Sequence, residues 1–130
     1  MAGELILIIE DNDKNLKLLR DVLQVKGYET IEATTAEEGL PLARAQRPAL
    51  VLMDIQLPGM DGITAFRRLR SEPITEQIPV IAVTASAMTL DKAKIMQAGF
   101  DGYQPKPIRV KDFVEEVRRV LDAAQKRVTE

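Results

Sequence analysis

Short apolar runs alternate along the chain with longer stretches in which apolar residues recur at helical spacing. Three of the runs, residues 5–9, 50–53 and 80–83, are apolar without alternation, which is typical of strands buried on both faces of a parallel sheet. Two further strands are more polar, the alternating segment 28–33 and a short one around 102–104, and polarity favours an edge position. The pattern therefore predicts a five-stranded sheet with three central strands and two edge strands.

A helix is predicted after each strand. Their approximate ranges are 13–26, 35–45, 63–69, 90–98 and 113–121. Strict alternation of strands and helices implies a parallel sheet with helices on both faces, and right-handed crossovers favour the strand order 2-1-3-4-5. The predicted fold is a doubly wound α/β domain.

Polar side chains stand where the strands end. Glu10 and Asp11 follow the first strand, Asp54 ends the third, Thr84 ends the fourth, and Lys106 follows the fifth. In the order 2-1-3-4-5 the chain reverses direction between the first and third strands, so the three acids become neighbours at that point. A lone Asp at a strand end is most simply a polar cap, but the coincidence at four strand ends favours a functional site.

Three neighbouring carboxylates imply a cation. Like charges within a few ångströms raise one another's pKa unless something positive intervenes. The chain has no Cys and no His, and oxygen ligands at a shallow rim that keeps several waters suit Mg²⁺ better than Ca²⁺. With the ammonium of Lys106 and the hydroxyl of Thr84 nearby, this site could accept a phosphoryl group, with Asp54 attacking in line.

Composition narrows the classes of function. At 130 residues the chain is long enough for one core, and we expect a single domain over 1–130 with its core at about 5–121 and no output domain. A net charge of -2 without a basic stripe argues against nucleic-acid binding. Residues 1–4 lack signal-peptide features, and the longest apolar run, residues 5–9, is too short to cross a bilayer. No membrane association and a cytoplasmic location are therefore expected.

Four motifs carry a resemblance to a known family. They are Glu10-Asp11-Asn12, Met53-Asp54 with Leu57-Pro58-Gly59-Met60-Asp61-Gly62, Val83-Thr84-Ala85, and Lys106-Pro107. In this order and spacing they resemble the receiver domain of bacterial two-component response regulators, which has a CheY-like (flavodoxin-like) fold, and the resemblance covers essentially the whole chain. Within that family the chain is most similar to the single-domain type that regulates the cell cycle.

The resemblance implies a phosphoacceptor and a Mg²⁺ site. Asp54 would accept the phosphoryl group. The metal would be held by Glu10, Asp11, Asp54 and the backbone carbonyl of Gln56. Beyond phosphorylating itself from a donor and slowly hydrolysing the aspartyl phosphate, such a protein is not expected to be an enzyme.

The resemblance also implies a switch. Lys106 would pair with Asp54 or its phosphoryl group, and the Lys106-Pro107 peptide would be cis. Thr84 would bond a phosphoryl oxygen, and Tyr103 would turn inward behind it. Ser86, together with Gln56, would tune the rate of dephosphorylation.

The implied partners are a histidine kinase or phosphotransfer protein as donor, and a downstream protein target. The helix around Leu90-Ala98 has more apolar positions than one buried stripe requires. One interpretation is that part of this surface, with the fifth strand and last helix, binds the target; the other is a mostly buried helix. Under the first interpretation, Ile95→Glu would spare folding.

Two rival functions stay open at this point. One is a pseudo-receiver that binds partners without being phosphorylated, although such proteins usually lack an acid, the lysine or the hydroxyl, and all are present here. The other is a phosphatase with an aspartyl nucleophile. The haloacid-dehalogenase pattern needs a second acid two residues after the nucleophile, and here that residue is Gln56.

Overall fold

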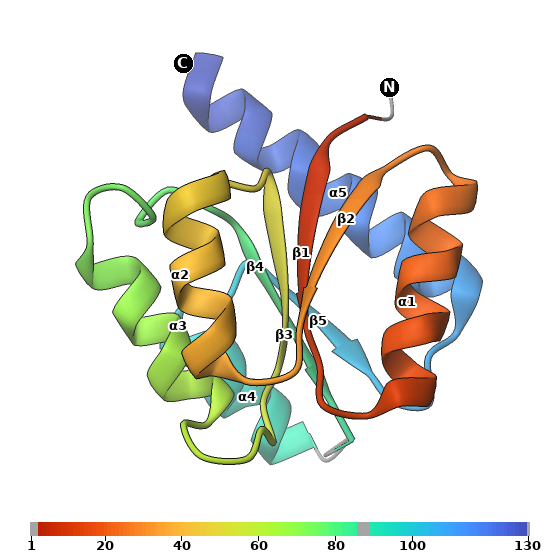
Figure 1. Cartoon of the computed structure of the whole chain (residues 1–130), viewed down its shortest axis with the longest axis horizontal. Helices are drawn as coiled ribbons and strands as arrows, with labels where there is room; N and C mark the ends of the chain where they lie inside the picture. Colours follow the sequence, from red (N-terminus) through yellow and green to blue (C-terminus); the bar gives the residue numbers. More distant parts are fainter. Residues whose placement is uncertain (1–2, 86–88, 130) are drawn as a thin grey trace.

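A computed structural model describes residues 3–85 and 89–129 of the protein, in which strands and helices alternate strictly (Figure 1). The strands are β1 (Leu5–Ile9), β2 (Glu29–Ala33), β3 (Leu50–Asp54), β4 (Val80–Thr84) and β5 (Gly102–Pro105). The helices are α1 (Asp13–Val25), α2 (Ala36–Gln46), α3 (Gly62–Ser71), α4 (Thr89–Ala98) and α5 (Val110–Thr129). The predicted series of ten elements is confirmed.

The strands form one parallel sheet in the order β2-β1-β3-β4-β5, which confirms the predicted order. β2 and β5 are the edge strands, as their polarity indicates. The register pairs Ile9 with Met53, Asp54 with Val83, and Thr84 with Pro105. The carboxyl ends of β1, β3, β4 and β5 therefore lie along one edge of the sheet.

Helices cover both faces of the sheet, and each face has its own core. α1 and α5 cover one face, where Leu19 and Phe113 belong to the same core cluster as Ile8 of β1. α2, α3 and α4 cover the other, and there Phe66 packs in a cluster that contains Ile9. Successive residues of a central strand thus enter opposite cores, which is why the central strands are apolar throughout.

The turn after β3 depends on a glycine. Asp61 caps α3 by accepting the backbone N–H of Thr64 (2.8 Å). Gly62, the first residue of α3, approaches β3 so closely that a Cβ there would collide with the carbonyl oxygen of Asp54. The chain can therefore turn back against the end of β3 only because position 62 has no side chain.

The longest helix, α5, is amphipathic. Its apolar side buries Phe113 and Val117 against the sheet, while charged residues such as Arg119 lie on its outer side, where the Arg119 side chain is 57% exposed. Over the part of the chain described by the structure, no helix combines the length and apolarity that crossing a membrane requires.

The sequence-based interpretation of α4 needs a correction. Ile95 is only 3% exposed and belongs to the core on its face of the sheet, so the prediction that Ile95→Glu would spare folding is wrong. The neighbouring Met96 is 40% exposed and is an apolar α4 side chain that a partner could reach. Met88 and the side chain of Leu90 lie outside the described part of the chain.

Candidate functional site

Three carboxylates meet at the carboxyl ends of β1 and β3, as predicted. One oxygen from each of Glu10, Asp11 and Asp54 lies within 4.8 Å of the others, and we call these residues the acidic cluster. Glu10 and Asp54 are buried (1% and 3% exposed), whereas Asp11 is exposed to solvent. The cluster therefore has a buried floor and one open side.

Lys106 reaches the acidic cluster from the edge strand. Its Nζ lies 2.9 Å from Oε1 of Glu10 and 3.2 Å from Oδ2 of Asp54. Its backbone N–H donates to the carbonyl of Thr84 (2.8 Å), and the Lys106-Pro107 peptide is cis, as the family resemblance implied. One ammonium faces three carboxylates, which leaves a formal excess of negative charge.

Backbone amides orient the two buried carboxylates. Oε2 of Glu10 accepts the N–H of Asn12 (3.1 Å), and Oδ1 of Asp54 accepts the N–H of Gln56 (2.9 Å). The second oxygen of each points to Lys106. Oε1 of Glu10 is buried, and its ion pair with Nζ of Lys106 (2.9 Å) compensates part of its charge.

Burial and crowding shift the pKa values of the cluster. Burial raises the pKa of Glu10 to about 7, and the neighbouring Asp54 adds to this effect while Lys106 opposes it. Burial would lower the pKa of Lys106, but Glu10 and Asp54 together outweigh that effect and raise it. Lys106 therefore stays protonated near neutral pH, and full ionisation of Glu10 needs further positive charge.

The residues present fit a hard divalent cation such as Mg²⁺. All of the side-chain donors are carboxylate oxygens, and the single ammonium of Lys106 does not balance their charge. Exposed Asp11 leaves one side open for the waters that Mg²⁺ retains. The backbone of Gln56 lies beside this group, because its amide is bound to Asp54.

The two predicted switch residues lie at different depths on this edge. Thr84 is fully buried at the end of β4, one residue beyond the partner of Asp54 in the register. Tyr103 is half-buried on β5 and packs against the core beneath α2, α3 and α4, and Nζ of Lys92 lies 5.5 Å from its ring centroid. Ser86 lies outside the described residues.

One contact at this edge was not predicted. Oε2 of Glu37, in the first turn of α2, accepts the backbone N–H of Met60 (3.2 Å) in the loop that follows Asp54. Glu37 lies 23 residues before Met60 and belongs to none of the four motifs. No periodicity or turn signal could have indicated this contact.

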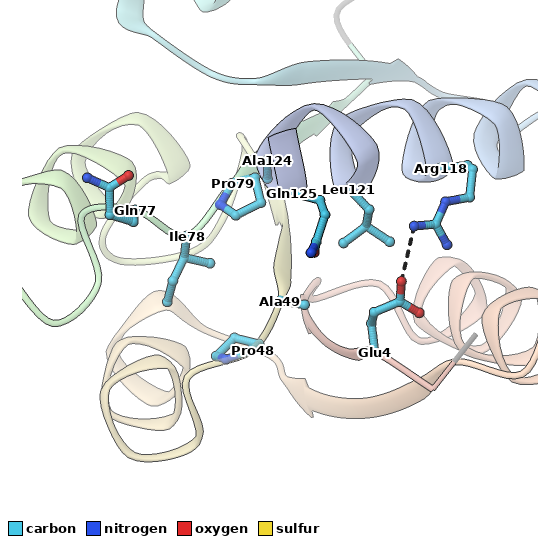
Figure 2. A pocket seen from close by; sticks show the side chains of 10 residues that line it. All are labelled: Glu4, Pro48, Ala49, Gln77, Ile78, Pro79, Arg118, Leu121, Ala124 and Gln125. Atoms are coloured by element: carbon cyan, nitrogen blue, oxygen red, sulfur yellow. Dashed lines mark hydrogen bonds and ion pairs between the residues drawn. The ribbon is translucent and has the colours of Figure 1, made fainter. Parts of the chain in front are cut away.

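A separate hollow of about 260 Å³ lies at the opposite, amino end of the strands (Figure 2). Arg118 of α5 and Glu4 before β1 point toward each other at one side of it, with Nη2 and Oε2 3.1 Å apart. Pro48, Ile78 and Leu121 contribute apolar walls. The hollow shares no residue with the acidic cluster, which as a shallow rim site does not need a cavity.

Residues 6–118 match the response regulator receiver domain family. The chain belongs to this family. A curated relative of this receiver domain is the polar-differentiation response regulator DivK of Brucella anthropi, 45% identical over 119 residues that cover 92% of this chain and 97% of the relative. DivK of Brucella ovis is 44% identical, with the same coverage of both chains. The protein is thus a DivK-like receiver of two-component signalling.

Solved structures share the fold. A putative response regulator from Chloroflexus aurantiacus superposes with a TM-score of 0.88 at 32% identity, covering 92% of this receiver and 98% of that chain. The receiver domain of the sensor histidine kinase PA1611 from Pseudomonas aeruginosa gives 0.85 at 31% identity, with the same coverage, and holds a magnesium ion in its active-site cleft. Structural relatives with this topology therefore include one with Mg²⁺ bound.

Proposed function

We propose that this receiver domain is a phosphorylation-dependent switch in which Asp54 accepts a phosphoryl group from a histidine kinase or phosphotransfer protein. One observation carries the proposal: Asp54 lies within the acidic cluster with one oxygen bound to the Gln56 amide and the other 3.2 Å from Lys106. An Asp54 oxygen would form a bond to phosphorus while the phosphohistidine P–N bond breaks and its electron pair returns to the imidazole. The product is an aspartyl phosphate.

The proposal assigns the metal site to four residues. Glu10, Asp11 and Asp54 would each supply a carboxylate oxygen, and Gln56 its backbone carbonyl. Bound Mg²⁺ would neutralise charge on the transferring phosphoryl oxygens. The close approach of one oxygen from each of the three carboxylates supports this assignment, as does the magnesium ion in the PA1611 receiver.

Within the chain, Lys106 and Thr84 would bind the phosphoryl group on Asp54. Lys106 already faces Asp54, so its ammonium would pair with a phosphoryl oxygen, while the Thr84 hydroxyl would donate to another. Tyr103 would then turn inward behind Thr84. Reversing a two-state equilibrium from mostly off to mostly on needs about 5 kcal/mol, which two or three charge-assisted hydrogen bonds can supply.

The target would bind where α4, β5 and α5 meet. Met96 supplies exposed apolar surface on α4, and the Lys92–Tyr103 contact joins α4 to β5, so movement of Tyr103 would alter this surface. Similarity to the polar-differentiation regulator DivK and the resemblance to single-domain cell-cycle regulators favour a target in these processes. We also propose that residues 1–130 fold as a single receiver domain and that the protein is cytoplasmic.

The intact mass of the protein after incubation with Mg²⁺ and acetyl phosphate tests this function. We expect an adduct of one phosphoryl group that requires Mg²⁺ and is absent from Asp54→Asn. A chain that binds Mg²⁺ but never gains the adduct would instead be a constitutive pseudo-receiver. Rapid multiple turnover of phosphomonoesters would identify a phosphatase.

A further inference from the structure

We propose that Glu37 is a positioning residue that holds the loop after Asp54 ready for metal and so raises the affinity of the site for Mg²⁺. The loop comprises residues 55–61 between β3 and α3, and we call it the β3–α3 loop. The inference rests on the proposed function, since it takes the Gln56 carbonyl in this loop as a metal ligand.

Both ends of the β3–α3 loop are fixed by the sheet and by α3. At its start, Ile55 donates its N–H to the carbonyl of Val83 (3.0 Å), and Gln56 donates to Asp54 (2.9 Å). At its end, the N–H of Gly62 donates to the carbonyl of Ile55 (3.0 Å). These bonds hold the base of the loop and leave its tip, Pro58 to Met60, to other contacts.

Glu37 holds the tip. Its Oε2 accepts the N–H of Met60 (3.2 Å). A Cβ at Gly59, where φ is +73°, would lie 2.7 Å from the same oxygen, so the carboxylate lies directly against the loop backbone. The backbone of Glu37 is held in the first turn of α2, because Thr35 caps this helix. Oγ1 of Thr35 accepts the N–H of Glu38 (3.1 Å).

A loop fixed at its base and tip has fewer conformations to lose when a ligand binds. Gln56 lies between the Asp54 end and the Met60 contact, so the Glu37 bond restricts the segment that carries the proposed carbonyl ligand. Binding to a preorganised loop costs less ordering entropy than binding to a free one. For a single exposed hydrogen bond we expect an effect of about fivefold on the dissociation constant for Mg²⁺.

Three variants of the full chain test the inference. Glu37→Ala removes the acceptor, and Glu37→Gln keeps an oxygen that can accept the Met60 N–H. The control is Glu115→Ala, because Glu115 is an exposed helical carboxylate for which the described residues include no hydrogen-bond or ion-pair partner. Calorimetry would give the dissociation constant for Mg²⁺, and the initial rate of phosphorylation from acetyl phosphate would be measured across Mg²⁺ concentrations.

We expect Glu37→Ala to weaken Mg²⁺ binding about fivefold and to raise the half-saturating Mg²⁺ concentration equally, with an unchanged rate at saturation. Glu37→Gln should bind like the wild type, and thermal midpoints should match that of Glu115→Ala. Equal affinity of Glu37→Ala and Glu115→Ala for Mg²⁺, or an affinity of Glu37→Gln as weak as that of Glu37→Ala, would overturn the role of Glu37 but not the proposed function. Failure of the wild-type chain to bind Mg²⁺ would instead overturn the proposed function.

Discussion

Lys106 pairs with Asp54 across an intervening strand. Lys106 follows β5 and Asp54 ends β3, and β4 separates these two strands in the sheet. Nζ of Lys106 nevertheless lies 3.2 Å from Oδ2 of Asp54. The bond from the Lys106 N–H to the carbonyl of Thr84 fixes the backbone, so the side chain extends over the end of β4. This ion pair connects the edge of the sheet to its centre.

Removing this ammonium should destabilise the metal-free protein. In Lys106→Ala, the buried carboxylates of Glu10 and Asp54 lose their cation, and we expect the free energy of unfolding at neutral pH to fall by about 3 kcal/mol. Millimolar Mg²⁺ should restore part of the loss by replacing the missing charge. Urea titrations with and without Mg²⁺ measure both effects, and an unchanged midpoint without metal would contradict the prediction.

Asp54→Asn should change the titration of its neighbour as well as abolish phosphorylation. Burial is the largest cause of the raised pKa of Glu10, and Asp54 contributes next. Replacing Asp54 by a neutral amide should therefore lower the pKa of Glu10 from about 7 without returning it fully to that of a free glutamate. Carbon-detected NMR of the side-chain carboxyl groups measures this, with wild-type protein in the same buffer as control.

The stability of the metal-free protein should depend on the ionisation of Glu10. Its pKa is 4.5 in the absence of perturbation and about 7 in the folded chain, so the folded state holds the proton more tightly. The resulting stabilisation is complete below about pH 4.5 and is lost as the pH rises through about 7.

Denaturant titrations between pH 5 and 8 would measure this dependence. We expect the contribution of Glu10 to decline by up to about 3 kcal/mol over its titration. Glu10→Gln cannot titrate at this position and should lack the decline. Saturating Mg²⁺ should remove it as well, because a bound cation keeps Glu10 ionised. A wild-type profile identical to that of Glu10→Gln would refute the linkage.

Two adjacent residues of α4 should respond oppositely to the same substitution. Ile95→Glu places a charge in the core, where Ile95 is 3% exposed, and should cost at least about 3 kcal/mol of stability. Met96→Glu alters a side chain that is 40% exposed and should leave the thermal midpoint nearly unchanged while weakening target binding. Thermal unfolding and capture of the target by phosphorylated protein distinguish the two effects.

Much of the fold could be predicted from local patterns. The apolar runs at residues 5–9, 50–53 and 80–83 correspond to β1, β3 and β4, because strands covered by helices on both faces must be apolar at every position. The polar residues that end these strands were predicted to meet, since the carboxyl ends of parallel strands share one edge. Glu10, Asp11 and Asp54 do so.

Tertiary packing decided the rest. The apolar residues of α4 lie on more than one side of the helix, so periodicity could not show that Ile95 faces the core and Met96 faces solvent. The Glu37–Met60 bond joins segments 23 residues apart that share no pattern. Local sequence determines which face of an element is apolar, but the distance between side chains from different elements depends on how the helical layers pack on the sheet.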